Sequence, residues 1–255
     1  MKNYLCSAAI VGLLGLTIVP AANAAELKVL TAGAYDQVFQ ALLPEFEKQT
    51  GHTVKSEKGP AGTLKKRVES GEAFDVAIIT PAVMEALIKD GKMAAQGYAK
   101  VGMVGVGVGV KEGAPKPDIS TVEGFKRALV AAKAVAYTDP ATGATSGTFV
   151  DGLLVRLGIA DQVRPKAKLK KGGHAGEFVA SGEADIVVQQ ASEIIPVKGV
   201  VLVGPLPAEI QNTTTYAAAV SSQSQQKAAA QALINALTSP TAAAVLKAKG
   251  MEPAK

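Results

Sequence analysis

The sequence predicts an α/β protein built from two doubly wound lobes with a cleft between them. A Ser-Gly-Glu-Ala unit followed by a short β-branched run occurs at Ser70 and again, about 110 residues later, at Ser181. Such runs are typical of buried strands in parallel sheets, and helix-like patterns alternate with them along the chain. Both runs end in polar or small residues, and ligands of open α/β sheets bind beyond the carboxyl ends of strands. We therefore expect the two lobes to meet strand end to strand end.

The first residues predict export. Residues 1–24 contain one lysine near the start, an apolar stretch and small residues before Ala25, which is typical of a cleaved secretory signal. We expect a soluble, exported protein that is cleaved near Ala24. Cys6 is the only cysteine, so the mature chain has no disulfide and no thiolate nucleophile. We assign residues 25–103 and 204–255 to the first lobe and residues 104–203 to the second.

The charge pattern argues against a nucleic-acid partner. The formal net charge is +5, but the basic residues form only short clusters, at residues 65–67 and 168–171. Aromatic residues make up 4% of the chain and tryptophan is absent, whereas nucleic-acid readers combine a basic stripe with aromatic platforms. What remains is a weak preference for an anionic ligand.

The apolar spacing predicts the elements of the first lobe. We expect a strand at residues 27–31, a turn at 32–36 and a helix after it, a strand at 52–56, a flexible loop at 58–63 and a helix after it, the strand of the first Ser-Gly-Glu-Ala unit, and a helix at 81–92. The order strand, helix, strand, helix, strand is that of a doubly wound parallel half.

Residues 101–110 alternate glycine with an apolar residue, which predicts a strand with no side chains on one face. Because glycine weakens a strand, we expect another backbone or a ligand to approach that face closely. We place the first crossing between the lobes here. The pattern is weak as a nucleotide motif, because no helix opens after it.

The second lobe repeats the plan before the chain returns to the first. We expect helices at residues 121–132 and 148–157, a short helix after His174, strands at 134–137, 199–203 and 213–220 besides the second repeat strand, and closing helices at 226–237 and 240–249. Residues 138–147 form a polar turn in which backbone amides and the positive end of a helix can face a ligand. Alternatively, Thr145 or Ser146 only caps that helix.

Catalytic and metal-binding patterns are missing. His52 and His174 have no partner at metal-ligand spacing; we interpret His52 as structural and His174 as a candidate ligand contact in a loop that faces the cleft. Glu72 and Glu183 precede their strands, remote from the cleft, so an acid–base pair there is not expected. No nucleophile elbow, zinc-protease motif or Walker loop is present. We predict no enzyme activity, no catalytic residue, no metal and no cofactor.

Several stretches together carry a family resemblance. They are residues 28–34 (Lys-Val-Leu-Thr-Ala-Gly-Ala), 62–64 (Gly-Thr-Leu), 69–75 (Glu-Ser-Gly-Glu-Ala-Phe-Asp), 139–140 (Asp-Pro), 146–147 (Ser-Gly), 182–184 (Gly-Glu-Ala), 239–240 (Ser-Pro) and 249–250 (Lys-Gly). The chain resembles the solute-binding proteins of bacterial ABC importers with the type II periplasmic binding fold, and among them the molybdate-binding group. The resemblance implies a monomer that closes on its ligand and delivers it to an ABC permease in the inner membrane.

In that family a tetrahedral oxyanion is held without a countercharge by serine hydroxyls, backbone amides at helix starts, and a tyrosine of the second lobe. Here the first two serine positions fall at Ala34 and Ala61 and the tyrosine near Gln190, while Ser146 lies in the third ligand loop. Each lost hydrogen bond to a charged ligand removes roughly 1.5–3 kcal/mol, and micromolar binding needs about 8 kcal/mol.

We therefore expect a small anion, either a molybdate-like oxyanion or an organic carboxylate, and the missing donors argue against molybdate itself. The expected ligand-binding residues are Gly33, Ala34, Tyr35, Ala61, Gly62, Thr63, Thr80, Thr145, Ser146, His174 and Gln190. Two alternatives stay open: a periplasmic ligand-sensing protein that serves a membrane sensor, and an exported hydrolase or lyase, which would need a catalytic base in the cleft.

Overall fold

The computed structural model describes residues 24–254, so the predicted signal peptide, except its last residue, lies outside the described part of the chain. In chain order the helices and strands are β1 (Glu26–Ala32), α1 (Gly33–Thr50), β2 (Thr53–Gly59), α2 (Ala61–Glu69), β3 (Val76–Ile79), α3 (Pro81–Lys89), β4 (Ala99–Lys111), α4 (Val122–Ala131), β5 (Val135–Thr138), the 3₁₀ turn η1 (Pro140–Thr142), α5 (Thr145–Arg156), α6 (Ala160–Val163), β6 (Ala167–Lys170), α7 (Glu177–Ala180), β7 (Ile186–Gln190), α8 (Ala191–Ile194), β8 (Val200–Pro205), β9 (Thr213–Val220), α9 (Lys227–Leu237) and α10 (Pro240–Ala248).

One curled sheet connects two lobes. Within residues 24–254 nine strands run in the order β2-β1-β3-β9-β4-β7-β5-β6, with β8 paired to β4 beside this path. We call the part built on β1, β2, β3 and β9 the first lobe, and the part built on β5, β6, β7 and β8 the second lobe. The strands β1, β2 and β3 are parallel, as are β5, β6 and β7, which agrees with the predicted α/β class.

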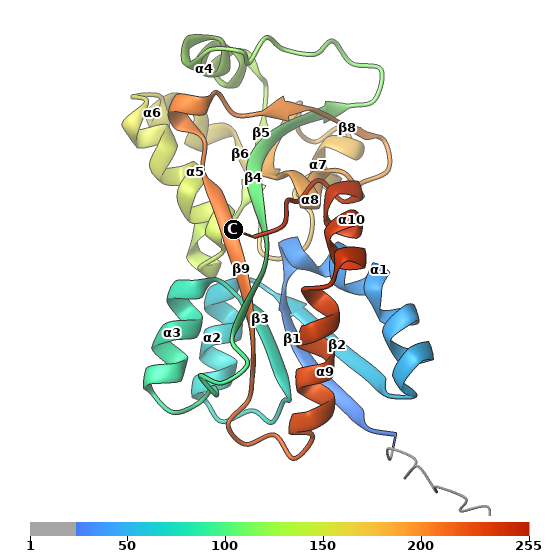
Figure 1. Ribbon diagram of the computed structural model, residues 1–255. Helices are drawn as coiled ribbons and strands as arrows, with labels where there is room; N and C mark the ends of the chain where they lie inside the picture. The colour runs from blue at the N-terminus through green and yellow to red at the C-terminus, as the bar shows by residue number, and fades with distance from the viewer. Residues whose placement is uncertain (1–23, 255) are drawn as a thin grey trace, which may run out of the picture.

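The strand β4 contributes to both lobes. Its residues 99–105 pair antiparallel with β9, and residues 106–111 pair antiparallel with β7 and β8. Figure 1 shows β4 in green and β9 in orange running side by side through the middle of the molecule.

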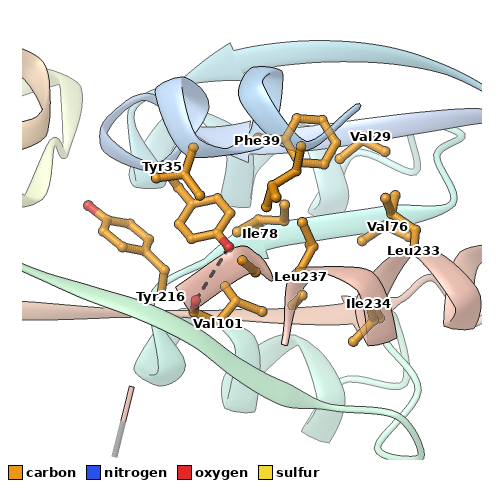
Figure 2. Close-up of a cluster of buried hydrophobic side chains, with 14 of the residues drawn as sticks. Val29, Tyr35, Phe39, Val76, Ile78, Val101, Tyr216, Leu233, Ile234 and Leu237 are labelled. Carbon is orange, nitrogen blue, oxygen red and sulfur yellow. Dashed lines mark hydrogen bonds between the residues drawn. The ribbon is translucent and has the colours of Figure 1, made fainter. Parts of the chain in front are cut away.

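Helices cover both faces of the first-lobe sheet at β1 and β3, because these strands are apolar on both sides. Alternate residues of β3 separate accordingly: Val76 and Ile78 pack with α1 and α9, whereas Ala77 and Ile79 pack with α2 and α3. Figure 2 shows the first of these clusters, in which the buried Tyr35 hydroxyl donates a hydrogen bond to the carbonyl of Val101 at 3.3 Å.

The closing helices α9 and α10 belong to this core and bury Leu233, Ile234 and Leu246. Among the described residues no single helix is long and apolar enough to cross a membrane, and α9 and α10 qualify only together, as a pair bent by 59°.

The face of β4 on which the glycines lie is covered by neighbouring side chains. A Cβ atom on Gly109 would lie 2.7 Å from Ile194 of α8, and one on Gly107 would lie 2.8 Å from Leu202 of β8. The expected close approach is therefore present, but apolar side chains provide most of it, and neither a ligand nor an extended backbone is required.

Several predicted element boundaries were wrong. Near the cleft, each helix begins earlier in the sequence than predicted. The expected turn at residues 32–36 and the flexible loop at 58–63 are mostly regular structure, since α1 begins at Gly33 and α2 at Ala61. Helix α5 begins at Thr145, three positions before the predicted start. The strand β6 and the one-turn helices α6 and α8 were also missed.

Candidate functional site

A cavity lies where the carboxyl ends of the parallel strands β1, β2, β5, β6 and β7 face one another. Its volume is about 110 Å³, on a scale where one water molecule needs about 10–15 Å³, so a ligand of several non-hydrogen atoms fits. Segments from both lobes contribute to the wall. The lining residues are Ala32, Gly33, Ala34, Lys58, Gly59, Pro60, Ala61, Thr138, Ala144, Thr145, Ser146, Gly172, Gly173, His174, Gln190, Glu193 and Tyr216.

Three long helices begin at this cavity without side-chain caps. The residues that precede α1, α2 and α5 are Ala32, Pro60 and Ala144, and none of their side chains accepts a hydrogen bond from the first turn. Of the helices that begin elsewhere, α4 and α10 are capped by Thr121 and Ser239, whereas α3 and α9 have no side-chain cap. Uncapped first-turn N–H groups and the positive end of the helix dipole together attract an anion.

Buried polar atoms without partners give independent support for a ligand. Gln190 is only 2% exposed, and its Oε1 accepts a hydrogen bond from the Tyr216 hydroxyl at 3.0 Å. Its Nε2 has no hydrogen-bond partner among the described residues, and neither has Nδ1 of His174. Because an unsatisfied buried polar atom costs about 1–3 kcal/mol, a ligand that pairs with these atoms recovers that free energy.

Ser146 also keeps its hydroxyl available. Its side chain is buried on the first turn of α5, yet neither Thr145 nor Ser146 caps the helix or makes a side-chain hydrogen bond within residues 24–254. The alternative that these residues only cap α5 is therefore wrong, since the capping position belongs to Ala144.

Glu193 is a buried carboxylic acid among the residues that line the cavity. Its carboxyl group is buried on the short helix α8, and no ion pair reaches it within the described part of the chain. Burial raises the pKa of Glu193 to about 8, against opposing effects of the Gln189 amide and the Lys58 charge. At neutral pH the side chain is thus mostly the uncharged acid and can donate an O–H hydrogen bond.

The charges around Glu193 are otherwise balanced. The ammonium group of Lys58 lies 2.9 Å from the buried carboxylate of Asp36, so these two charges pair with each other. Burial, and after it the Lys58 charge, lowers the pKa of His174 and favours the neutral imidazole. With Glu193 protonated, the cavity wall has no unbalanced negative charge that would repel an anion.

Seven of the eleven predicted site residues line the cavity: Gly33, Ala34, Ala61, Thr145, Ser146, His174 and Gln190. The other four lie elsewhere. Tyr35 is in the core of the first lobe, where burial raises its pKa, and Thr63 is exposed on α2. Thr80 precedes α3 away from the cavity. Gly62 touches the second lobe, where its N–H donates to the Gly143 carbonyl at 3.3 Å.

Lys58, Glu193 and Tyr216 are among the lining residues that the predicted site did not include. Glu193 lies three residues beyond the second repeat strand, so the strand-end argument that selected Gln190 could have reached it. Tyr216 lies in the middle of β9, and no local pattern distinguishes it from a core residue. Lys58 was assigned to a flexible loop, whereas β2 continues through it to Gly59.

The two repeat glutamates lie away from the cavity. Glu72 pairs with Lys28 at 2.9 Å and with Arg67, and these partners lower its pKa to about 2, the Arg67 hydrogen bond having the largest effect. Glu183 is exposed and accepts a hydrogen bond from Ser181. Among the described residues no group of three His, Cys, Asp or Glu side chains is arranged to hold a metal ion.

Comparison with known proteins identifies the family. Residues 27–252 match the family described as bacterial extracellular solute-binding protein. The chain belongs to this family. One relative in sequence is aconitate isomerase of Pseudomonas sp, 32% identical over 233 residues, which are 89% of this chain and 87% of that protein. Another is the molybdate-binding protein ModA of Azotobacter vinelandii, 30% identical over 241 residues, which are 90% and 91% of the two chains.

Solved structures of binding proteins have the same fold. The periplasmic molybdate-binding protein of Azotobacter vinelandii superimposes with a TM-score of 0.74 at 24% identity, covering 90% of this chain and 100% of that chain. The two sequence relatives are a binding protein and an enzyme, so membership of the family does not decide between ligand capture and catalysis.

Proposed function

We propose that this solute-binding protein captures a small organic polycarboxylate between its lobes in the periplasm and delivers it to an ABC permease in the inner membrane. The observation that carries the proposal is the buried carboxyl group of Glu193, which lines the cavity beside three uncapped helix starts. Together they offer charge-assisted hydrogen bonds to more than one carboxylate group.

The donor set fits a carboxylate better than a tetrahedral oxyanion. Ala34 and Ala61 leave only backbone amides where serine hydroxyls are expected for molybdate, and Gln190 replaces the tyrosine. The neutral acid Glu193 and the unpaired Nε2 of Gln190 extend the donor set along the second-lobe wall. A ligand with carboxylates at both ends can use both groups of donors.

The relatives support an anionic ligand of this kind. ModA of Azotobacter vinelandii is named for molybdate, and the isomerase of Pseudomonas sp is named for aconitate, a tricarboxylate. Both ligands are small anions, and the second has three carboxylate groups to distribute among the helix starts.

Thermal unfolding in the presence of candidate ligands tests the proposal. The purified protein is heated with molybdate, tungstate, sulfate, phosphate and a panel of di- and tricarboxylates, with sodium chloride at matched ionic strength as the control. A ligand at a hundred times its dissociation constant adds about 2.7 kcal/mol, which raises Tm by several degrees. A shift with molybdate and none with carboxylates would refute the proposed ligand class.

A second candidate function is isomerisation of the bound polycarboxylate. The aconitate isomerase relative favours it, since it shares 32% identity over nearly the whole chain. Incubation of the protein with cis-aconitate and measurement of the trans isomer by proton NMR separates the two functions. Binding without conversion supports capture alone, and conversion supports the enzyme.

A further inference from the structure

We propose that Glu193 is the proton-transfer residue of the cavity, which moves a proton between two carbon atoms of a bound unsaturated polycarboxylate. This inference rests on the proposed ligand class and extends it to a reaction. It assigns proton transfer to one residue, although the sequence contains no recognised catalytic motif.

The position of Glu193 places its carboxyl group at the ligand. A Cβ atom on Gly33 would lie 3.1 Å from Oε1 of Glu193, so the carboxyl oxygen closely faces the first residue of α1. The adjacent Ser192 fixes this geometry, because its hydroxyl donates to the Ala34 carbonyl at 2.7 Å. An anion held by the first-turn amides of α1 is thereby in reach of the Glu193 carboxyl group.

A buried carboxyl group without an ion pair is costly, and packing does not require one here. Neighbouring positions of α8 bury Ser192 through a hydrogen bond and Ile194 through apolar contacts, whereas Glu193 turns toward the cavity. The titratable groups around it are Lys58 of β2, His174 after β6 and Tyr216 of β9. Lys58 is paired with Asp36, and within residues 24–254 no other cation forms an ion pair with Glu193.

The reaction balances without a cofactor or a redox partner. Ionised Glu193 takes a proton from the methylene carbon beside one carboxylate as the C–H bond breaks. The electron pair forms a new double bond to the central carbon, and the former double-bond pair moves toward the carboxylate at the far end as a dienolate. The Glu193 O–H then gives its proton to the far carbon. The double bond has moved by one position, and the carboxyl group is as it began.

The surroundings suit both halves of this transfer. Negative charge grows on the ligand carboxylate in the dienolate, where the uncapped amides of α1, α2 and α5 stabilise it. A pKa of about 8 for Glu193 makes its anion a stronger base than an ordinary carboxylate while part of it is still ionised at neutral pH.

The test measures binding and turnover of cis-aconitate separately in the wild-type protein and in Glu193→Gln. We expect the wild type to form the trans isomer, and Glu193→Gln to bind aconitate within a few-fold of wild type yet lose turnover by at least about 100-fold. Glu183→Gln is the matched control, because Glu183 is an exposed glutamate outside the cavity, and should turn over normally.

The outcomes are separable. If the wild type does not bind aconitate, the proposed ligand fails; if it binds aconitate without isomerising it, the ligand class stands and the reaction fails. Full turnover in Glu193→Gln, or its loss only in His174→Gln, overturns the assignment of Glu193. If Glu193→Gln does not fold, the wild-type pH profile decides: kcat/KM should rise with pH and level off near pH 8, and a flat profile across that range overturns the proposal.

Discussion

Glu193 makes the stability of the ligand-free protein depend on pH. Its pKa is raised from an ordinary 4.5 to about 8, so the folded state keeps a proton that the unfolded chain has already released. The contribution of Glu193 to stability is therefore fully present below about pH 4.5, falls as pH rises toward 8, and does not change further above that value.

Glu193→Gln removes this titration, and we expect its Tm to exceed that of wild type by an amount that grows between pH 5 and pH 8. Circular dichroism melts at several pH values measure the difference. His174 titrates in both proteins and cancels in the comparison. Two parallel curves would mean that Glu193 is ionised in the folded protein.

Ser146→Ala tests the ligand side of the cavity. The hydroxyl makes no hydrogen bond within the described part of the chain, so its removal should leave the Tm of the free protein nearly unchanged. A hydrogen bond to a charged ligand contributes roughly 1.5–3 kcal/mol, so affinity should fall by about 10- to 100-fold. Calorimetric titration with the ligand found in the thermal screen gives the value. Unchanged affinity would remove Ser146 from the site.

At the scale of elements, the contact between β4 and α8 determines where Glu193 lies. In Gly109→Ala the new methyl group would meet Ile194 at 2.7 Å and Val187 at 2.9 Å, and both are held in the core. We expect a loss of roughly 1–3 kcal/mol in the free energy of unfolding. Urea denaturation measures it.

Gly152→Ala in α5 is the matched control for this substitution, since a Cβ atom there has no neighbour within 4 Å. It should stabilise the protein by about 0.5–1 kcal/mol, because alanine is the better helix former. Equal stability of the two variants would show that α8 yields easily and that its packing does not position the carboxyl group.

The element order could be predicted because buried strands and amphipathic helices leave periodic patterns, such as the run that became β3 and the one that became β9. The helix starts at the cavity could not, because Ala32, Pro60 and Ala144 are not capping residues. Capping side chains, which make a helix start recognisable in a sequence, would occupy the N–H groups that this site needs for its ligand.

The predicted site residues were likewise correct only in part. Ala34 lies just beyond the end of β1, and Ser146 lies in the polar turn and helix start after β5; both were selected through the family resemblance together with the expectation that ligands bind beyond strand ends. Tyr35 was expected to face the ligand, but it lies within the first turns of α1 and its ring points into the core. Glu193 was missed because four residues are too few for α8 to show a periodic pattern.

For the whole molecule, the contact between Gly62 and Gly143 joins the two lobes beside the cavity. A Cβ atom on Gly62 would lie 3.0 Å from the Gly143 Cα atom and 3.1 Å from the Thr142 carbonyl oxygen. We expect Gly62→Ala to hold the lobes apart and weaken ligand affinity by several-fold, because closure brings donors from both lobes onto the ligand.

Gly62 is half-buried and Gly143 is exposed, so the Tm of ligand-free Gly62→Ala should stay close to that of wild type. Calorimetric titration and thermal melts of the same sample give both quantities. An unchanged affinity would show that the ligand is held without this approach of the lobes.

The three uncapped helix starts also have an evolutionary consequence. Backbone amides are present whatever the side chain, so most point mutations leave this anchor for negative charge in place. The surrounding side chains, such as Gln190 and Glu193, can be substituted while the backbone amides still bind an anion. One fold can therefore change its ligand, or gain a reaction, by small inherited steps that each keep a working site.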